Sequence, residues 1–252
     1  MPSPGRLRAS LGLLLLLLAI PARGLGASAQ DVVRKVQDRY DQTQNFAADF
    51  TQEMRIEAGG QVIKSSGKVW FQRPGRMHWE YLSPEKQTII ADGTTLWIVQ
   101  PADNQVLKAP LQNAFESRTP VSFLLGVARL EKDFRATLLS PGDDGRLRLQ
   151  LDPAKSDDGS LGSLILDVDP DTWDVEAATI RDPLGNTTRV ALVDVKRNGT
   201  VDESLFRFER PSGMDVIEAP TQRASGEAKE RAVPTFEVVS QVDIQEVANA
   251  LQ

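Results

Sequence analysis

The 252-residue sequence contains no cysteine and a single histidine, His78. Without cysteine the chain cannot form a disulfide framework, so packing alone must hold the fold. The same absence removes the residue that carries a bacterial lipid anchor. We therefore expect a chain that is freely soluble and is not itself a lipoprotein.

The sequence also lacks the common catalytic motifs. A histidine-based triad would have to use His78, which we expect on the solvent side of a strand beside Glu80. There is no G-x-S-x-G elbow, phosphate loop or cluster of metal ligands. The acidic pairs Asp143-Asp144 and Asp157-Asp158 both run into glycine, which is typical of turns rather than of calcium sites. We predict a protein that is not an enzyme and needs neither metal nor cofactor.

Long hydrophobic runs are scarce. One run, Leu11–Ile20, follows Arg6 and Arg8 and precedes Ala27-Ser28-Ala29, the layout of a secretory signal peptide cleaved before Gln30. It is shorter than the roughly 20 apolar residues that span a bilayer. We expect export to the periplasm and loss of residues 1–29. That segment carries three arginines and no acid, so the net charge moves from −6 to −9, which argues against nucleic acid as a partner.

The remaining chain alternates between short apolar-periodic segments and turn residues. Asp31–Gln44 has helical spacing, and Thr119-Pro120 begins a short apolar helix. Strands are predicted over Phe46–Ile56, Val62–Gln72, Met77–Leu82, Thr88–Ala91, Thr95–Val99, Phe134–Leu139, Arg146–Leu151, Leu164–Val168, Val175–Arg181, Thr187–Lys196 and Phe206–Arg210. Their near-regular spacing favours an up-and-down antiparallel sheet that curls into a barrel or half-barrel. The fold class is thus mainly β with short helices (α+β).

We expect one domain over residues 30–219, followed by a linker and C-terminal extension over residues 220–252. Pro220–Pro234 is polar and charged, which is typical of a linker. Beyond it, Phe236–Val242 could form another strand and Asp243 could open a short helix.

The segment Gly67–Pro101 holds three of the four tryptophans. Met77, Trp79 and Tyr81 share one face of a predicted strand, and Val69 and Phe71 alternate likewise on the strand before. A filled core uses the same residue types as a ligand cavity, so periodicity leaves both interpretations open. Arg73 is either a solvated rim residue or a guanidinium that donates to carbonyls of a covering loop or helix.

Several spaced motifs resemble those of the periplasmic outer-membrane lipoprotein carrier family, LolA. They lie between about Asp31 and Ile217 and are specific by their order: Gly67…Trp70-Phe71-x-Arg73-Pro74-Gly75…Trp79-Glu80-Tyr81…Pro84…Gln87…Asp92-Gly93…Leu96-Trp97, with Phe46–Gln52, Thr119-Pro120-x-x-Phe123-Leu124-Leu125, Asp182-x-x-Gly185-Asn186-Thr187-Thr188 and Phe206-x-Phe208-x-x-Pro211-x-Gly213.

The resemblance implies an incomplete antiparallel barrel, with a short-helix lid over a hydrophobic cavity that takes the acyl chains of lipoproteins. It implies three partners: outer-membrane-directed lipoproteins, the inner-membrane ABC transporter that releases them and an outer-membrane receptor. The family's lid-holding arginine falls on Arg73 and its cavity-mouth aromatic on Met77, a departure in residue type. We expect a monomer whose cavity is lined by Phe50, Val69, Phe71, Met77, Trp79, Tyr81, Ile90, Phe123 and Leu124.

Three alternatives have distinct requirements. The outer-membrane receptor of the same pathway would carry an anchoring cysteine after its signal peptide. A half-barrel lipoprotein sensor would need an additional domain, and the tail is too short for one. An envelope hydrolase would need a nucleophile and base that the sequence does not offer.

Overall fold

The structure is a computed structural model of the chain and describes residues 27–111, 130–142, 144–154 and 163–218. The predicted signal peptide, the helix after Thr119 and the C-terminal extension therefore lie outside the described residues, apart from Ala27, Ser28 and Ala29 at the end of the signal segment.

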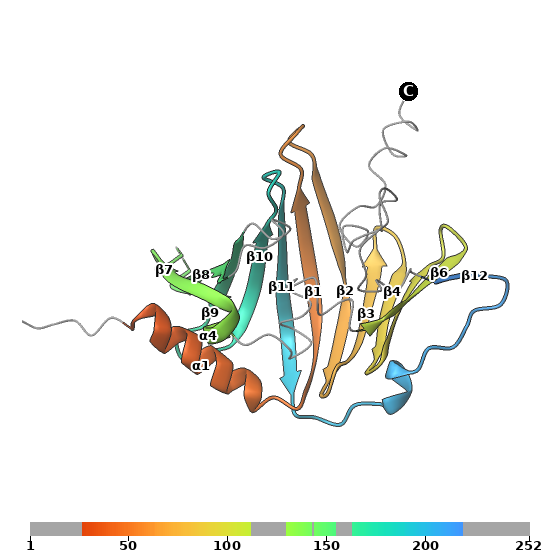
Figure 1. Cartoon of the computed structure of the whole chain (residues 1–252), viewed down its shortest axis with the longest axis horizontal. Coiled ribbons are helices and arrows are strands. Elements are labelled where there is room, and N and C mark those ends of the chain that lie inside the picture. The colour runs from red at the N-terminus through yellow and green to blue at the C-terminus, as the bar shows by residue number, and fades with distance from the viewer. Residues whose placement is uncertain (1–26, 112–129, 143, 155–162, 219–252) are drawn as a thin grey trace, which may run out of the picture.

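Within these described ranges, twelve strands form one curved sheet (Figure 1). Their order is β12-β6-β5-β4-β3-β2-β1-β11-β10-β9-β8-β7. The strands are β1 (Asn45–Arg55), β2 (Val62–Gln72), β3 (Arg76–Ser83), β4 (Gln87–Asp92), β5 (Thr95–Gln100), β6 (Gln105–Pro110), β7 (Phe134–Leu139), β8 (Leu147–Pro153), β9 (Ser163–Val168), β10 (Val175–Arg181), β11 (Thr187–Arg197) and β12 (Asp215–Glu218).

The sheet consists of two antiparallel meanders, β1–β6 and β7–β11. They are joined because β1 pairs with both β2 and β11. Within the described chain β7 and β12 are the two edges and do not pair with each other, so the barrel stays open. This confirms the predicted mainly β fold with short helices and an incomplete barrel. One short strand departs from the antiparallel pattern, since β12 runs parallel to β6.

Helix α1 (Ala29–Asp41) packs on the β7–β10 half of the sheet (Figure 1). Ser28 and Asp31 form a capping box that satisfies free N–H groups at its start. Its buried face, Val32, Val33 and Val36, joins Leu149 and other leucines of β8 and β9 in one apolar core. The cap lies in the segment that we expect to be removed on export.

Short elements account for the main errors in the prediction. Strand β6, helix α4 (Leu130–Asp133) and strand β12 were not predicted. The strand predicted over Phe206–Arg210 is absent from the structure: Glu203–Phe206 forms a 3-10 helix, η1, with Asp202 as its N-cap. Phe206 and Phe208 alternate as in a strand, but the local Asp202 cap fixes a turn instead.

Candidate functional site

Six of the predicted cavity residues lie together on the inner face of the sheet. Strands β1, β2 and β3 bring them together by their period of two, because paired residues on neighbouring strands point to the same side. They are 1 to 8% exposed and belong to one apolar cluster, which we call the inner wall. Its predicted members are Phe50, Val69, Phe71, Met77, Trp79 and Tyr81.

Aromatic rings make up much of the inner wall. The Phe50 ring lies 4.6 Å from the ring of Trp79 and meets Tyr81 edge-on at 5.1 Å, measured between ring centroids. Gly67 makes this packing possible, since a Cβ there would meet the backbone oxygen of Glu80 at 1.8 Å and Phe50 Cε1 at 2.8 Å. The sheet register also shifts between Ser66 and Gly67. The glycine thus lets β2 approach β3 and leaves room for the Phe50 ring.

Arg73 ties the end of β2 to the end of α1. Its Nε donates to the carbonyl oxygen of Thr43 and its Nη2 to that of Tyr40, both at 2.9 Å. The guanidinium also lies 4.6 Å from the centroid of the Tyr40 ring and 3.7 Å from an Asp41 carboxylate oxygen. These carbonyls are acceptors at a helix C-terminus, where a positive charge is favourable. Arg73 therefore holds the last turn of α1 against the inner wall.

A cavity of about 60 Å³ lies next to this contact. Val36 and Tyr40 of α1 line one side, and Phe46 and Leu192 of the sheet line the other. At its rim Asp174 accepts from Arg39 Nε at 2.6 Å and pairs with Arg197 at 3.1 Å. Burial raises the pKa of the Tyr40 hydroxyl well above its ordinary value, so it stays neutral. The space between α1 and the sheet is thus apolar inside and held by polar contacts at its edge.

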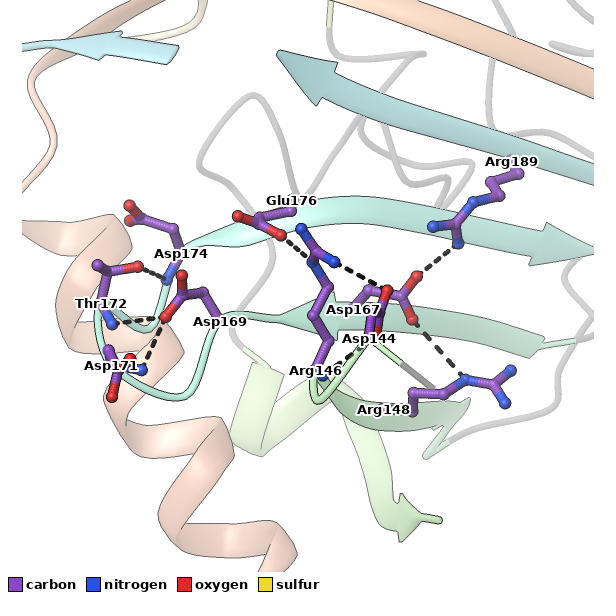
Figure 2. A network of polar contacts seen from close by, with 10 residues as sticks. All are labelled: Asp144, Arg146, Arg148, Asp167, Asp169, Asp171, Thr172, Asp174, Glu176 and Arg189. Atoms are coloured by element: carbon purple, nitrogen blue, oxygen red, sulfur yellow. Dashed lines mark hydrogen bonds and ion pairs between the residues drawn. The ribbon is translucent and has the colours of Figure 1, made fainter. Parts of the chain in front are cut away.

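The opposite, outer face of the sheet carries charged side chains along β8–β11 (Figure 2). Arg189 lies 2.5 Å and Arg148 3.8 Å from the Asp167 carboxylate, which is largely buried between them. Arg146 in turn pairs with Asp144 and Glu176. A hollow of about 460 Å³ among β1, β2, β3 and β11 is lined mainly by hydroxyl and charged side chains. The inner wall is therefore the apolar one of the two faces.

Two residues, Ile90 and His78, have surroundings in the structure that differ from those predicted from the sequence. Ile90 pairs with His78 and Trp97, which places it on the outer face, whereas Ile89 belongs to the inner wall. The expectation that Ile90 lines the cavity was wrong, because two adjacent isoleucines gave no alternation to choose between them. His78 is not simply solvated either: its Nδ1 lies 2.7 Å from the carbonyl oxygen of Leu205, beneath η1.

Comparison with known proteins identifies the family. The family model described as "Outer membrane lipoprotein carrier protein LolA" matches residues 41–209. The chain belongs to the LolA family. Curated LolA-family relatives are named outer-membrane lipoprotein carrier protein; one from Halorhodospira halophila is 36% identical over 74% of this chain and 86% of that protein. Others from Chromohalobacter salexigens and Methylococcus capsulatus are 34% and 29% identical, covering 69% and 81% of this chain and 80% and 96% of those proteins.

The LolA match covers the whole inner wall and Arg73. Phe123 and Leu124, which we expected to line the cavity, lie outside the described residues. Sequence reasoning did not assign seven of the wall residues to the cavity: Phe46, Ala48, Ile89, Ala91, Leu96, Ile98 and Leu111. The alternation Leu96-x-Ile98 was visible in the sequence, but its inward phase is fixed only by pairing with β4.

The described residues form neither a membrane-spanning helix nor a cluster of metal ligands. No helix there has the length and apolar character that crossing a membrane requires. In the same part of the chain, no three histidine or acidic side chains gather as metal ligands would.

Proposed function

We propose that this chain is a soluble periplasmic chaperone that binds the acyl chains of lipoproteins and carries them to an outer-membrane receptor. The observation that carries the proposal is the inner wall: bulky apolar side chains on one face of an open sheet in a LolA-family chain. In this proposal Phe50, Val69 and Phe71, with Met77, Trp79 and Tyr81, contact the acyl chains. In the same proposal, Arg73 holds the lid closed over the apolar cavity.

The energetics fit such a task. Each buried methylene is worth about 0.8 kcal/mol, so several acyl chains exposed to water cost tens of kcal/mol. A carrier must bury these chains and still give them up without a local energy source. Polar contacts that hold α1 at the edge of the wall, each worth about 1–3 kcal/mol, can be exchanged more easily than a fully packed core.

The proposed pathway has two further partners. An inner-membrane ABC transporter releases the lipoprotein to the carrier, and an outer-membrane lipoprotein receptor takes it over. The carrier itself performs no covalent chemistry and works as a monomer.

A direct test compares two synthetic lipopeptides of the same sequence, one triacylated and one unacylated. The purified full chain should bind the triacylated peptide and quench or shift tryptophan emission, and it should ignore the unacylated one. Mass spectrometry of protein purified from the periplasm should in addition detect bound lipoprotein. Equal affinity for both peptides, with no lipoprotein recovered, would overturn the proposal.

A further inference from the structure

One polar atom in the inner wall has no partner in the described chain: Nε1 of Trp79. Trp79 is 7% exposed, and the indole N–H itself is buried. Its ring packs against Phe50 in an otherwise apolar cluster. Buried donors are nearly always hydrogen-bonded, because an unpaired one loses its contact with water and gains nothing. An unpaired donor in a binding wall therefore points to a ligand acceptor.

Two polar groups, the Tyr81 hydroxyl and the Gln52 side chain, lie close to the Trp79 donor. The Tyr81 hydroxyl donates a hydrogen bond to Gln52 Oε1 at 3.1 Å. Burial raises the pKa of Tyr81 to about 12, so the hydroxyl stays neutral, although the hydrogen bond to Gln52 and the nearby indole N–H act in the opposite direction. The indole N–H and the Tyr81 oxygen do not meet with hydrogen-bonding geometry. The indole N–H of Trp79 is thus available as a donor beside the hydrogen-bonded side chains of Tyr81 and Gln52.

We propose that Trp79 Nε1 donates a hydrogen bond to the carbonyl oxygen of a bound acyl ester or amide. This rests on the proposed function and adds a polar determinant to it. A hydrocarbon tail has no acceptor, and the carbonyl is the strong acceptor that every acyl linkage carries. The site then recognises an acyl group rather than hydrocarbon alone, with the carbonyl held near Trp79 and Gln52.

Trp97 supplies a matched control on the other face of the sheet. Its Nε1 is likewise buried and meets no acceptor with hydrogen-bonding geometry, although the Asp92 carboxylate is nearby. However, its ring stacks on Phe208 at 4.1 Å, on the outer side, away from the inner wall. The two tryptophans share residue type and burial of the N–H and differ in the face they occupy.

The test uses the full chain and two lipopeptides with alkyl chains of equal length, one linked through esters and the other through ethers. Ether linkage removes the carbonyl oxygens and keeps the apolar volume. We expect the wild-type chain to bind the ester form about fivefold to tenfold more tightly, as for one hydrogen bond. Trp79→Phe should lose that preference by weakening ester binding alone, and Trp97→Phe should keep it.

The outcomes separate this inference from the proposed function. Equal wild-type affinity for both lipopeptides overturns the carbonyl contact and leaves the carrier function intact. A Trp79→Phe loss that is equal for the two probes also overturns it, because that pattern reports packing. Failure of the wild-type chain to bind either probe contradicts the proposed function instead.

A measurement on the wild-type chain covers the case in which Trp79→Phe does not fold. In ¹⁵N-labelled protein the four tryptophans give indole N–H resonances. The ester lipopeptide should move one of them downfield, as expected on forming a hydrogen bond, and the ether lipopeptide should not. The same response to both probes would overturn the proposal.

Discussion

Arg73 uses its planar side chain to contact several groups of α1 at once. It donates to two carbonyl oxygens and faces the Tyr40 ring, so one guanidinium holds a whole helix end. A lysine, with its single ammonium, could not reproduce that geometry. The sequence left Arg73 as either a solvated rim residue or a guanidinium bonded to carbonyls of a covering loop or helix. The contacts to Tyr40 and Thr43 are of the second kind. A latch role for Arg73 during transfer remains a prediction.

The first prediction concerns Arg73→Leu. The variant should load lipoprotein but release it to the receptor more slowly, because the C-terminal end of α1, no longer held by Arg73, competes less with the acyl chains for the inner wall. A transfer assay with purified receptor measures this, with Arg76→Leu as the control. Arg76 pairs with Glu203 on the outer face, so that variant should transfer normally. If Arg73→Leu also transfers at the wild-type rate, Arg73 has no part in release.

The second prediction concerns Gly67→Ala. The new methyl group would overlap the Glu80 carbonyl and crowd Phe50, so β2 or β3 must shift. Overpacking of this kind costs about 1–3 kcal/mol, and we expect a loss at the upper end in the free energy of unfolding. Urea denaturation measures it. Gly199→Ala is the control, since no atom lies within 4 Å of a Cβ there; similar stability losses in the two variants would contradict the packing role of Gly67.

At the scale of the element, long strands with clear alternation were predictable and short ones were not. Phe46, Ala48 and Phe50 alternate on β1, and the structure buries all three. In contrast, β12 has four residues and forms only because β6 offers a free edge. Such pairing depends on tertiary context, which a sequence pattern does not contain.

Tertiary context, which a sequence pattern does not contain, also decides the structure of the segment from Asp202 to Phe208. Its two phenylalanines do bury apolar surface, but against Arg76 and Trp97 on the outer face of the sheet rather than in a strand of their own. Hydrophobic period alone cannot tell these two cases apart. Likewise Ile90 could be placed only once its neighbours on β3 and β5 were known.

The third prediction concerns the β4–β5 turn. Burial acts to raise the pKa of Asp92, but hydrogen bonds from the backbone N–H groups of Thr95 and Thr94 outweigh it and hold the pKa below 3.8. The stabilisation is therefore present above pH 3.8 and is lost as the pH falls through the lower folded-state pKa. Asp92→Asn should be less stable than the wild type at pH 7, and the difference should narrow below about pH 3.8.

Urea denaturation at pH 7 and pH 3 measures both parts of that expectation. Asp103→Asn, in the turn before β6, controls for the change in net charge. A stability difference between wild type and Asp92→Asn that is the same at both pH values would show that the Asp92 charge does not support the turn.

At the scale of the whole molecule, the sheet is amphipathic across its thickness. Its inner side carries the inner wall and the core under α1, and its outer side carries the ion pairs of β8–β11 and the segment around η1. One layer of strands thus separates an apolar site from a polar surface. The sequence predicted this division in outline, because strict alternation places one set of residues on each side.

The fourth prediction concerns the C-terminal end. Removing residues 220–252 should leave folding and lipopeptide binding largely intact, because β12 ends at Glu218. Removing residues 215–252 should instead expose the edge of β6 and promote association between molecules. Light scattering and thermal unfolding distinguish the two truncations. Loss of folding in the shorter deletion would show that the extension completes the domain.

The pairing of β1 with β11 sets when the molecule can finish folding. Arg55 pairs with Thr187 and Phe46 with Arg197, so the first strand must wait for a partner made much later. Contacts so distant in sequence form slowly. A chain that enters the periplasm from its N-terminus would therefore travel with one edge of β1 unpaired. Because β11 follows β1 by more than 130 residues of chain, such a protein completes its sheet only after the later strands have also crossed the membrane.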